Sequence, residues 1–94
     1  MKSFAEQKVP GGKLVSVKIE YVRKIKNIQI LGDFFMHPES TVYKIEKALV
    51  GTYVGASKDE IAGKISKVVA MSGAELIGVT PDAIAETIKM AVKK

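Results

Sequence analysis

Apolar residues recur at every second position in the first part of the sequence and at helical spacing in the rest. The order of these two patterns constrains the fold more than any other feature. Between Lys13 and Val22, apolar residues alternate with polar ones, which predicts a half-buried β-strand. After the polar pair Arg23-Lys24, Ile28 and Ile30 continue the alternation, so a second strand returns to about Leu31. The two segments therefore form a predicted antiparallel β-hairpin.

A third strand is predicted upstream, from Phe4 to Val9. Pro10 ends this strand because proline has no backbone N–H to donate to a ladder, and Gly11-Gly12 permits a tight turn. The first third of the chain is therefore predicted to be a three-stranded antiparallel meander.

Beyond the hairpin, apolar residues recur at the spacing of amphipathic helices. A first helix is predicted from Glu39 to Val50, and a second begins at the capping sequence Ser57-Lys58-Asp59-Glu60 and runs to about Ala70. Thr80-Pro81-Asp82 supplies an N-cap and a helix-compatible proline for a third helix. The stretch from Met71 to Val79 has no clear period, and Gly73 to Gly78 is predicted to be a loop.

A strand-forming half followed by a helical half predicts an α+β fold, with about three helices packed on one face of a small three-stranded antiparallel sheet. The 94 residues, of which 47% are hydrophobic, suffice for a single domain spanning residues 1–94. The absence of cysteine, together with a single histidine, His37, argues against disulfides and a zinc centre. No apolar run approaches the roughly 20 residues of a membrane span, and no signal peptide is evident, so we expect a cytoplasmic protein with no membrane partner.

The formal net charge of +5 favours an acidic partner. Residues up to Pro38 carry +4 of this charge, which suggests one positive face. A small basic nucleic-acid-binding domain is therefore an alternative. The sequence disfavours it, because base reading and bidentate phosphate binding depend on arginine and Arg23 is the only one.

The glycine-rich segment from Lys8 to Lys13 is the first candidate site. Paired glycines allow backbone amides to approach a ligand closely, and the flanking lysines suit phosphate or carboxylate. The spacing is not that of a P-loop, and a strand follows rather than a helix. A plain hairpin turn and an anion-contacting turn both remain open.

The segment from Gly32 to Pro38 is the second candidate, because it places two phenylalanines and Met36 in a connection that should be polar. One interpretation has a phenylalanine covering the seam between sheet and helix, with Asp33 bonding neighbouring amides and Pro38 starting the helix. The other has the second ring and Met36 forming an exposed patch that docks on another protein. Neither excludes the other, and no nucleophile or paired carboxylates indicate an independent enzyme.

The C-terminal accessory domain of lipoate-protein ligases is similar to this chain in several motifs that occur in the same order. The motifs are Lys8-Val9-Pro10-Gly11-Gly12-Lys13-Leu14, the hairpin after it, Gly32-Asp33-Phe34-Phe35, Ala48-Leu49-Val50-Gly51 and the run from Ile77 to Asp82. The chain resembles the form found in bipartite ligases, in which this domain is a separate small chain. Because no catalytic domain precedes Met1, we expect a free-standing subunit.

The resemblance implies an accessory, non-catalytic subunit of a two-chain ligase. With the large catalytic subunit it would support ATP-dependent activation of lipoate to lipoyl-adenylate and lipoylation of a lysine on lipoyl domains. The positions that match the family's motifs are expected at the partner interface or over the active site. They are Lys8, Pro10, Gly11, Gly12, Lys13, Gly32, Asp33, Phe34 and Phe35.

The resemblance also implies that this chain binds no cofactor alone, whereas lipoate, ATP and Mg belong to the partner's active site. The expected partners are the large catalytic subunit, in a heterodimer, and the lipoyl domain as acceptor. A stand-alone ligand-binding domain that uses the glycine turn is a third hypothesis, which titration with ATP or lipoate would test.

Overall fold

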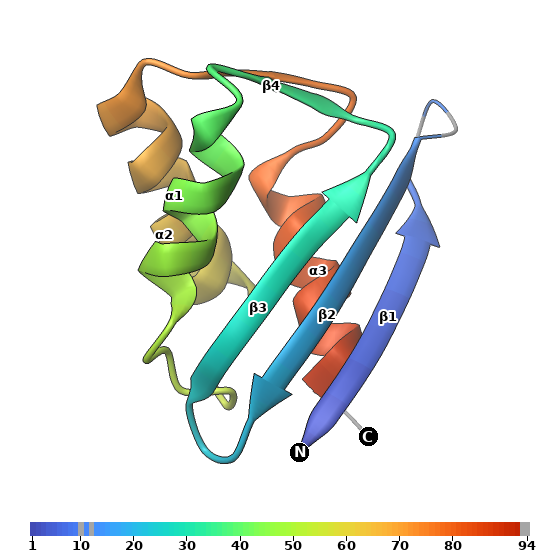
Figure 1. The fold of residues 1–94 in the computed structure, drawn as a ribbon, viewed down its shortest axis with the longest axis vertical. Helices are drawn as coiled ribbons and strands as arrows, with labels where there is room; N and C mark the ends of the chain where they lie inside the picture. The colour runs from blue at the N-terminus through green and yellow to red at the C-terminus, as the bar shows by residue number, and fades with distance from the viewer. Residues whose placement is uncertain (10, 12, 93–94) are drawn as a thin grey trace.

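The computed structural model describes residues 1–9, 11 and 13–92. The strands come first along the chain and the helices mostly follow them (Figure 1), which confirms the predicted α+β class. The elements are β1 (Lys2–Lys8), β2 (Leu14–Tyr21), β3 (Ile25–Gly32), β4 (Phe35–His37), α1 (Ser40–Leu49), α2 (Lys58–Ser72), β5 (Glu75–Ile77) and α3 (Pro81–Val92). None of the helices in the described part of the chain has the length and apolar character needed to traverse a bilayer.

The predicted meander is present as an antiparallel sheet with the order β1-β2-β3. In β2, Val15, Val17, Ile19 and Tyr21 are buried, as the alternation predicts, whereas Lys18 between them is exposed. Because side chains at every second position share one face of a strand, β2 turns its apolar side toward the helices.

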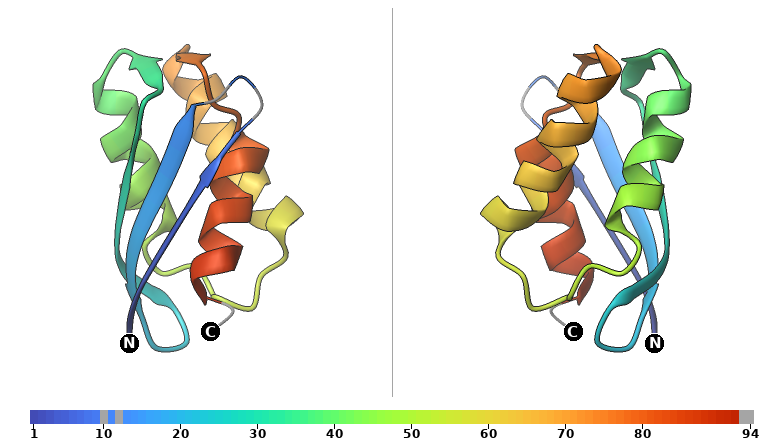
Figure 2. Two further views of the ribbon diagram at one scale, coloured as in Figure 1. Left: turned by 90° about the vertical axis from the view of Figure 1, so that its right-hand side faces the viewer. Right: turned by 90° about the vertical axis from the view of Figure 1, so that its left-hand side faces the viewer.

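The helices complete a single core against this sheet. Figure 2 shows α2 and α3 on the same side of the sheet, with α1 beside β3. The fully buried large side chains of the helices are Ile45, Leu49, Ile61, Ile65, Ile84 and Ile88. Burying each of them contributes about 1.5 to 3 kcal/mol, so the helices supply much of the hydrophobic stabilisation of this small domain.

The predicted helix caps form. The hydroxyl oxygen of Ser57 accepts from the amide of Glu60 at 3.1 Å, and that of Thr80 accepts from the amide of Ala83 at 3.1 Å. Gly73 ends α2 in the left-handed conformation, which a residue with a side chain rarely adopts. These caps explain why α2 and α3 begin close to the positions expected from the sequence.

A second sheet, formed by β4 and β5, was not predicted. Phe35 pairs with Ile77 and His37 pairs with Glu75, so the expectation of a loop from Gly73 to Gly78 is wrong for residues 75–77. Strands of three residues are too short to display a period of two. α1 begins at Ser40 after β4 and a turn, rather than at Pro38.

Candidate functional site: the apex of the sheet

Both segments singled out in the sequence lie at the end of the sheet where β1 turns into β2 (Figure 1). A third segment, which precedes α3, joins them there. We call this end the apex and define it by Lys8, Gly11, Lys13, Gly32–Phe35 and Ile77–Thr80. Pro10 and Gly12, the two other predicted site residues, lie outside the described residues.

The β1–β2 turn is closed by a hydrogen bond in which the amide of Val9 donates to the carbonyl of Lys13 at 2.8 Å. Gly11 has a φ of 96°, which favours glycine, and no atom of the described residues beyond its chain neighbours lies within 4 Å of where its Cβ would be. Lys8 is exposed, whereas Lys13 is half-buried. The turn therefore needs Gly11 for its backbone and leaves space around it.

Gly32 joins the two predicted site segments. The amide of Asp33 donates to the carbonyl of Leu14 at 3.1 Å. A Cβ on Gly32 would collide with that carbonyl oxygen and lie 2.8 Å from the ring of Phe34. Close backbone approach thus accounts for the glycine, and the β3–β4 connection is held against the start of β2.

The two phenylalanines have different environments, as the sequence analysis allowed. Phe34 is half-buried against the core, whereas Phe35 is 60% exposed. The interpretation that includes Met36 in an exposed patch is wrong for this residue: Met36 is only 3% exposed, because β4 alternates and turns this side chain inward. The exposed partner of Phe35 is Ile77, 43% exposed and directly opposite on β5. We call this pair the Phe35–Ile77 patch.

Gly78 brings the third segment against the turn. It has a φ of 85°, and a Cβ placed on it would lie 3.0 Å from Cγ of Lys13. The aliphatic stem of Lys13 therefore crosses the backbone at Gly78, next to Ile77. Sequence analysis assigned neither Gly78 nor Ile77 to the site, although an apolar pair bounded by Gly73 and Gly78 is a possible signal of a short strand.

A pocket of about 180 Å³ lies beside this contact. It is lined by Val9, Gly78, Val79, Thr80 and Ala83. Sites that enclose a drug-sized ligand usually measure about 300 to 1,000 Å³, so this pocket is too small to enclose an adenylate. The apex is better suited to cover a ligand held by another surface than to bind one alone.

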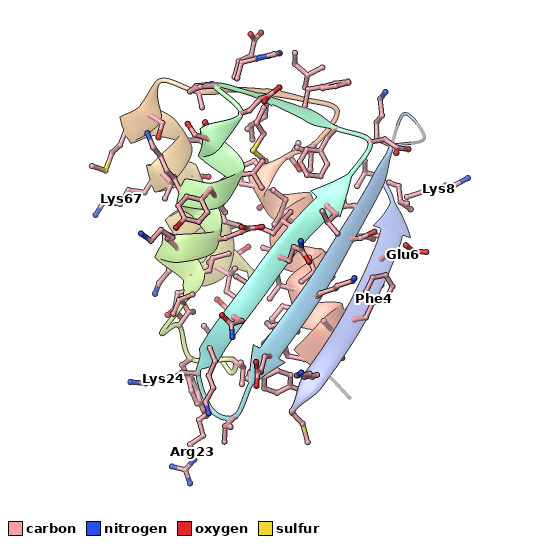
Figure 3. All side chains as sticks on the ribbon, in the orientation of Figure 1. Phe4, Glu6, Lys8, Arg23, Lys24 and Lys67 are labelled. Carbon is pink, nitrogen blue, oxygen red and sulfur yellow. The ribbon has the colours of Figure 1, made fainter. Side chains whose placement is uncertain are left out.

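The basic residues of the first half of the chain are spread along the sheet from one end to the other. Lys8 and Lys13 are at the apex, whereas Arg23 and Lys24 are in the β2–β3 turn at the opposite end (Figure 3). Lys18, in the middle of β2, is exposed between these two ends, so the positive charge is not concentrated at the apex. The described residues also contain no group of three or more His, Cys, Asp or Glu side chains arranged to hold a metal.

Comparison with solved structures identifies a relative. An archaeal lipoylation system from Thermoplasma acidophilum, described as a bipartite lipoate-protein ligase and its E2 lipoyl domain, contains a chain that matches this one with a TM-score of 0.76. The sequences are 27% identical, and the match covers 94% of each chain. This chain resembles the bipartite lipoate-protein ligases. No protein-family model and no curated protein matches it.

The similarity agrees with the motifs that indicated these ligases from the sequence. The coverage of both chains means that the shared structure is the whole domain and not only the sheet. At the apex, the chain combines two cations with an exposed apolar pair, which suits binding to a partner. The similarity to a bipartite lipoate-protein ligase system and the surface of the apex therefore both favour a role in binding another chain.

Proposed function

We propose that this chain is the accessory, non-catalytic subunit of a two-chain lipoate-protein ligase. With the large catalytic subunit, it supports activation of lipoate by ATP and transfer of the lipoyl group to a lysine of a lipoyl domain. The observation that carries the proposal is the structural similarity to a bipartite ligase system over 94% of both chains. The lipoate, ATP and Mg sites belong to the large subunit.

In this proposal, the apex is the surface that contacts the large catalytic subunit. In the activation step, the lipoate carboxylate attacks the α-phosphorus of ATP, pyrophosphate leaves, and lipoyl-adenylate forms. The adenylate keeps a negative phosphate and a hydrolysable mixed anhydride. The ammonium groups of Lys8 and Lys13 favour that phosphate, and exclusion of water by the turn and the Phe35–Ile77 patch protects the anhydride.

The decisive experiment measures pyrophosphate release from ATP and lipoate by the large subunit, with and without this chain. We expect release to depend on the chain. Full activity of the large subunit alone would refute the proposal. Steeply salt-dependent retention of the chain on DNA or RNA would then favour the nucleic-acid alternative.

Lys13 provides a sharper test of the apex. Lys13→Met keeps an unbranched stem against Gly78 but removes the charge, so we expect adenylate formation about tenfold slower with unchanged stability. Lys67→Met is the matched control, because it removes the same charge from α2, away from the apex (Figure 3). Equal kinetics for the two variants would remove the electrostatic role of Lys13.

A further inference from the structure

The outer edge of β1 presents unpaired backbone groups. Met1 and Tyr21 exchange two hydrogen bonds, of 2.9 and 2.8 Å, at one end of the β1–β2 ladder. In an antiparallel pair such bonded positions alternate, so the odd-numbered residues of β1 point their amides and carbonyls toward β2. The even-numbered residues point theirs away from the sheet. These are Lys2, Phe4, Glu6 and Lys8.

No described residue forms a backbone hydrogen bond with this outer edge. Several unpaired donors and acceptors in a row, at strand spacing, are complementary to one kind of ligand, which is another extended chain. The edge is long enough for specific pairing, because β1 has seven residues.

Side chains on this edge restrict what can pair with it. Figure 3 shows Phe4, Glu6 and Lys8 along β1, and Phe4 is 44% exposed. A strand added here would place its own side chains beside them on the same face, at directly opposite positions. A segment complementary to this edge would carry acidic residues opposite Lys2 and Lys8, an apolar residue opposite Phe4 and a basic residue opposite Glu6.

We propose that an extended segment of the large catalytic subunit binds this edge as a fourth strand of the sheet. This inference rests on the proposed function, because it assigns the docking surface of that partner. β1 leads directly into the turn that contains Lys13, so a strand paired with β1 continues to the apex. One partner chain then contacts both surfaces.

A second copy of this chain is a poorer occupant. Antiparallel self-pairing centred on Ala5 uses the whole strand but places Lys2 opposite Lys8 twice, and like charges in that position are destabilising. Pairing centred on Phe4 avoids this contact and places Lys2 opposite Glu6, which is favourable, but it leaves Lys8 beyond the end of its partner. In either case each copy brings a formal net charge of +5.

Residue-resolved amide exchange tests the proposal with the unaltered chain. In the free protein we expect fast exchange at Phe4 and Glu6 and slow exchange at Ala5. Addition of the large subunit should slow exchange at Phe4 and Glu6 at least tenfold. If adenylate formation depends on the chain but these amides stay unprotected in the complex, the edge inference is overturned and the proposed function stands.

The other outcomes also distinguish the edge inference from the proposed function. If the large subunit is fully active alone and forms no complex, both proposals fail. If Phe4 and Glu6 become protected as the chain alone is concentrated, the occupant is a second copy, which overturns the assignment to the large subunit.

A proline variant supplies an independent readout. Glu6→Pro removes one outward N–H and puts a ring where a partner strand would lie, whereas Glu6→Ala removes only the side chain, including its acceptance of a 3.1 Å bond from Ser16. We expect Glu6→Pro to bind the large subunit at least about tenfold more weakly than Glu6→Ala, with similar thermal stability. Equal affinity of the two variants would contradict strand pairing at this edge.

Discussion

The two edges of the three-stranded sheet differ in how their backbone groups are satisfied. At the β3 edge, the amide of Ile25 donates to the carbonyl of Thr52 at 2.9 Å, and the amide of Gly51 donates to the carbonyl of Ile25 at 2.8 Å. Further along, the amide of Ile30 donates to the carboxylate of Glu46 at 2.7 Å. The outer edge of β1 has no such partners among the described residues.

This difference shows that the backbone groups of a sheet edge are satisfied by neighbouring segments where that edge borders the core. At β3, a loop and one glutamate on α1 satisfy the amides of Ile25 and Ile30, whose side chains point into the core. At β1, the outward-facing residues turn their side chains to the helix-free face. Opening β3 would therefore expose the core, whereas leaving β1 open does not.

The largest effect we predict separates the inner and outer sides of β1. Ala5→Pro should lower the free energy of unfolding by about 3 kcal/mol or more, because it removes an amide from the β1–β2 ladder and enlarges a buried residue. Glu6→Pro, one position later, should cost less than about 1 kcal/mol. Urea denaturation of both variants measures the difference, and equal losses would disprove the assigned alternation of β1.

A smaller loss is expected at the apex end of β3. Gly32→Ala should cost more than about 2 kcal/mol, since its Cβ would meet the backbone carbonyl of Leu14, which cannot move aside as a flexible side chain can. Gly63→Ala in α2 is the control, because its Cβ would enter open space and alanine favours the helix by about 0.5 to 1 kcal/mol. A Gly32→Ala variant as stable as the parent would refute the close approach.

Substituting Glu46 removes a hydrogen-bond partner of the β3 edge without changing any residue of β3. Glu46→Ala should lower the free energy of unfolding by about 1 to 2 kcal/mol, because the amide of Ile30 loses its acceptor. Glu46→Gln retains an oxygen acceptor and should lose less. Exchange at the Ile30 amide should become faster in Glu46→Ala, and unchanged exchange would show that the carboxylate does not close the β3 edge.

The sequence predicted the elements with long repeating patterns. The alternation in β2 and the helical spacing after Ile61 each extend over enough residues to be distinguished from chance, and the caps at Ser57 and Thr80 depend only on neighbours in the chain. These features are local, so local rules suffice to predict them.

The remaining features depend on contacts between distant residues. Each strand of the β4–β5 pair is too short to show a period, and the pairing brings Phe35 to Ile77 across two helices of intervening sequence. Met36, between Phe35 and His37 on β4, is buried, whereas one of the two interpretations of this segment placed it in an exposed patch. The sequence did indicate the two main segments of the apex, but the third, at Ile77 and Gly78, is recruited by tertiary packing.

The smallest effect on stability is expected at the Phe35–Ile77 patch. Phe35→Ala should change the free energy of unfolding by no more than about 0.5 kcal/mol, because the ring is 60% exposed. It should nevertheless weaken binding to the large subunit about tenfold, since exposed aromatic residues often anchor interfaces. Titration calorimetry with the large subunit measures this change, and unaltered affinity would exclude the patch from the interface.

Phe34→Ala is the matched control for this prediction. Phe34 packs against the core and lies outside the Phe35–Ile77 patch, so its removal should lower stability more than Phe35→Ala does and weaken binding of the folded fraction less. Combining Phe35→Ala with Glu6→Pro then asks whether the apex and the open edge act together. If one rigid partner surface contacts both, the losses in binding free energy add; a combined loss equal to the larger single loss would mean that docking at one surface requires docking at the other.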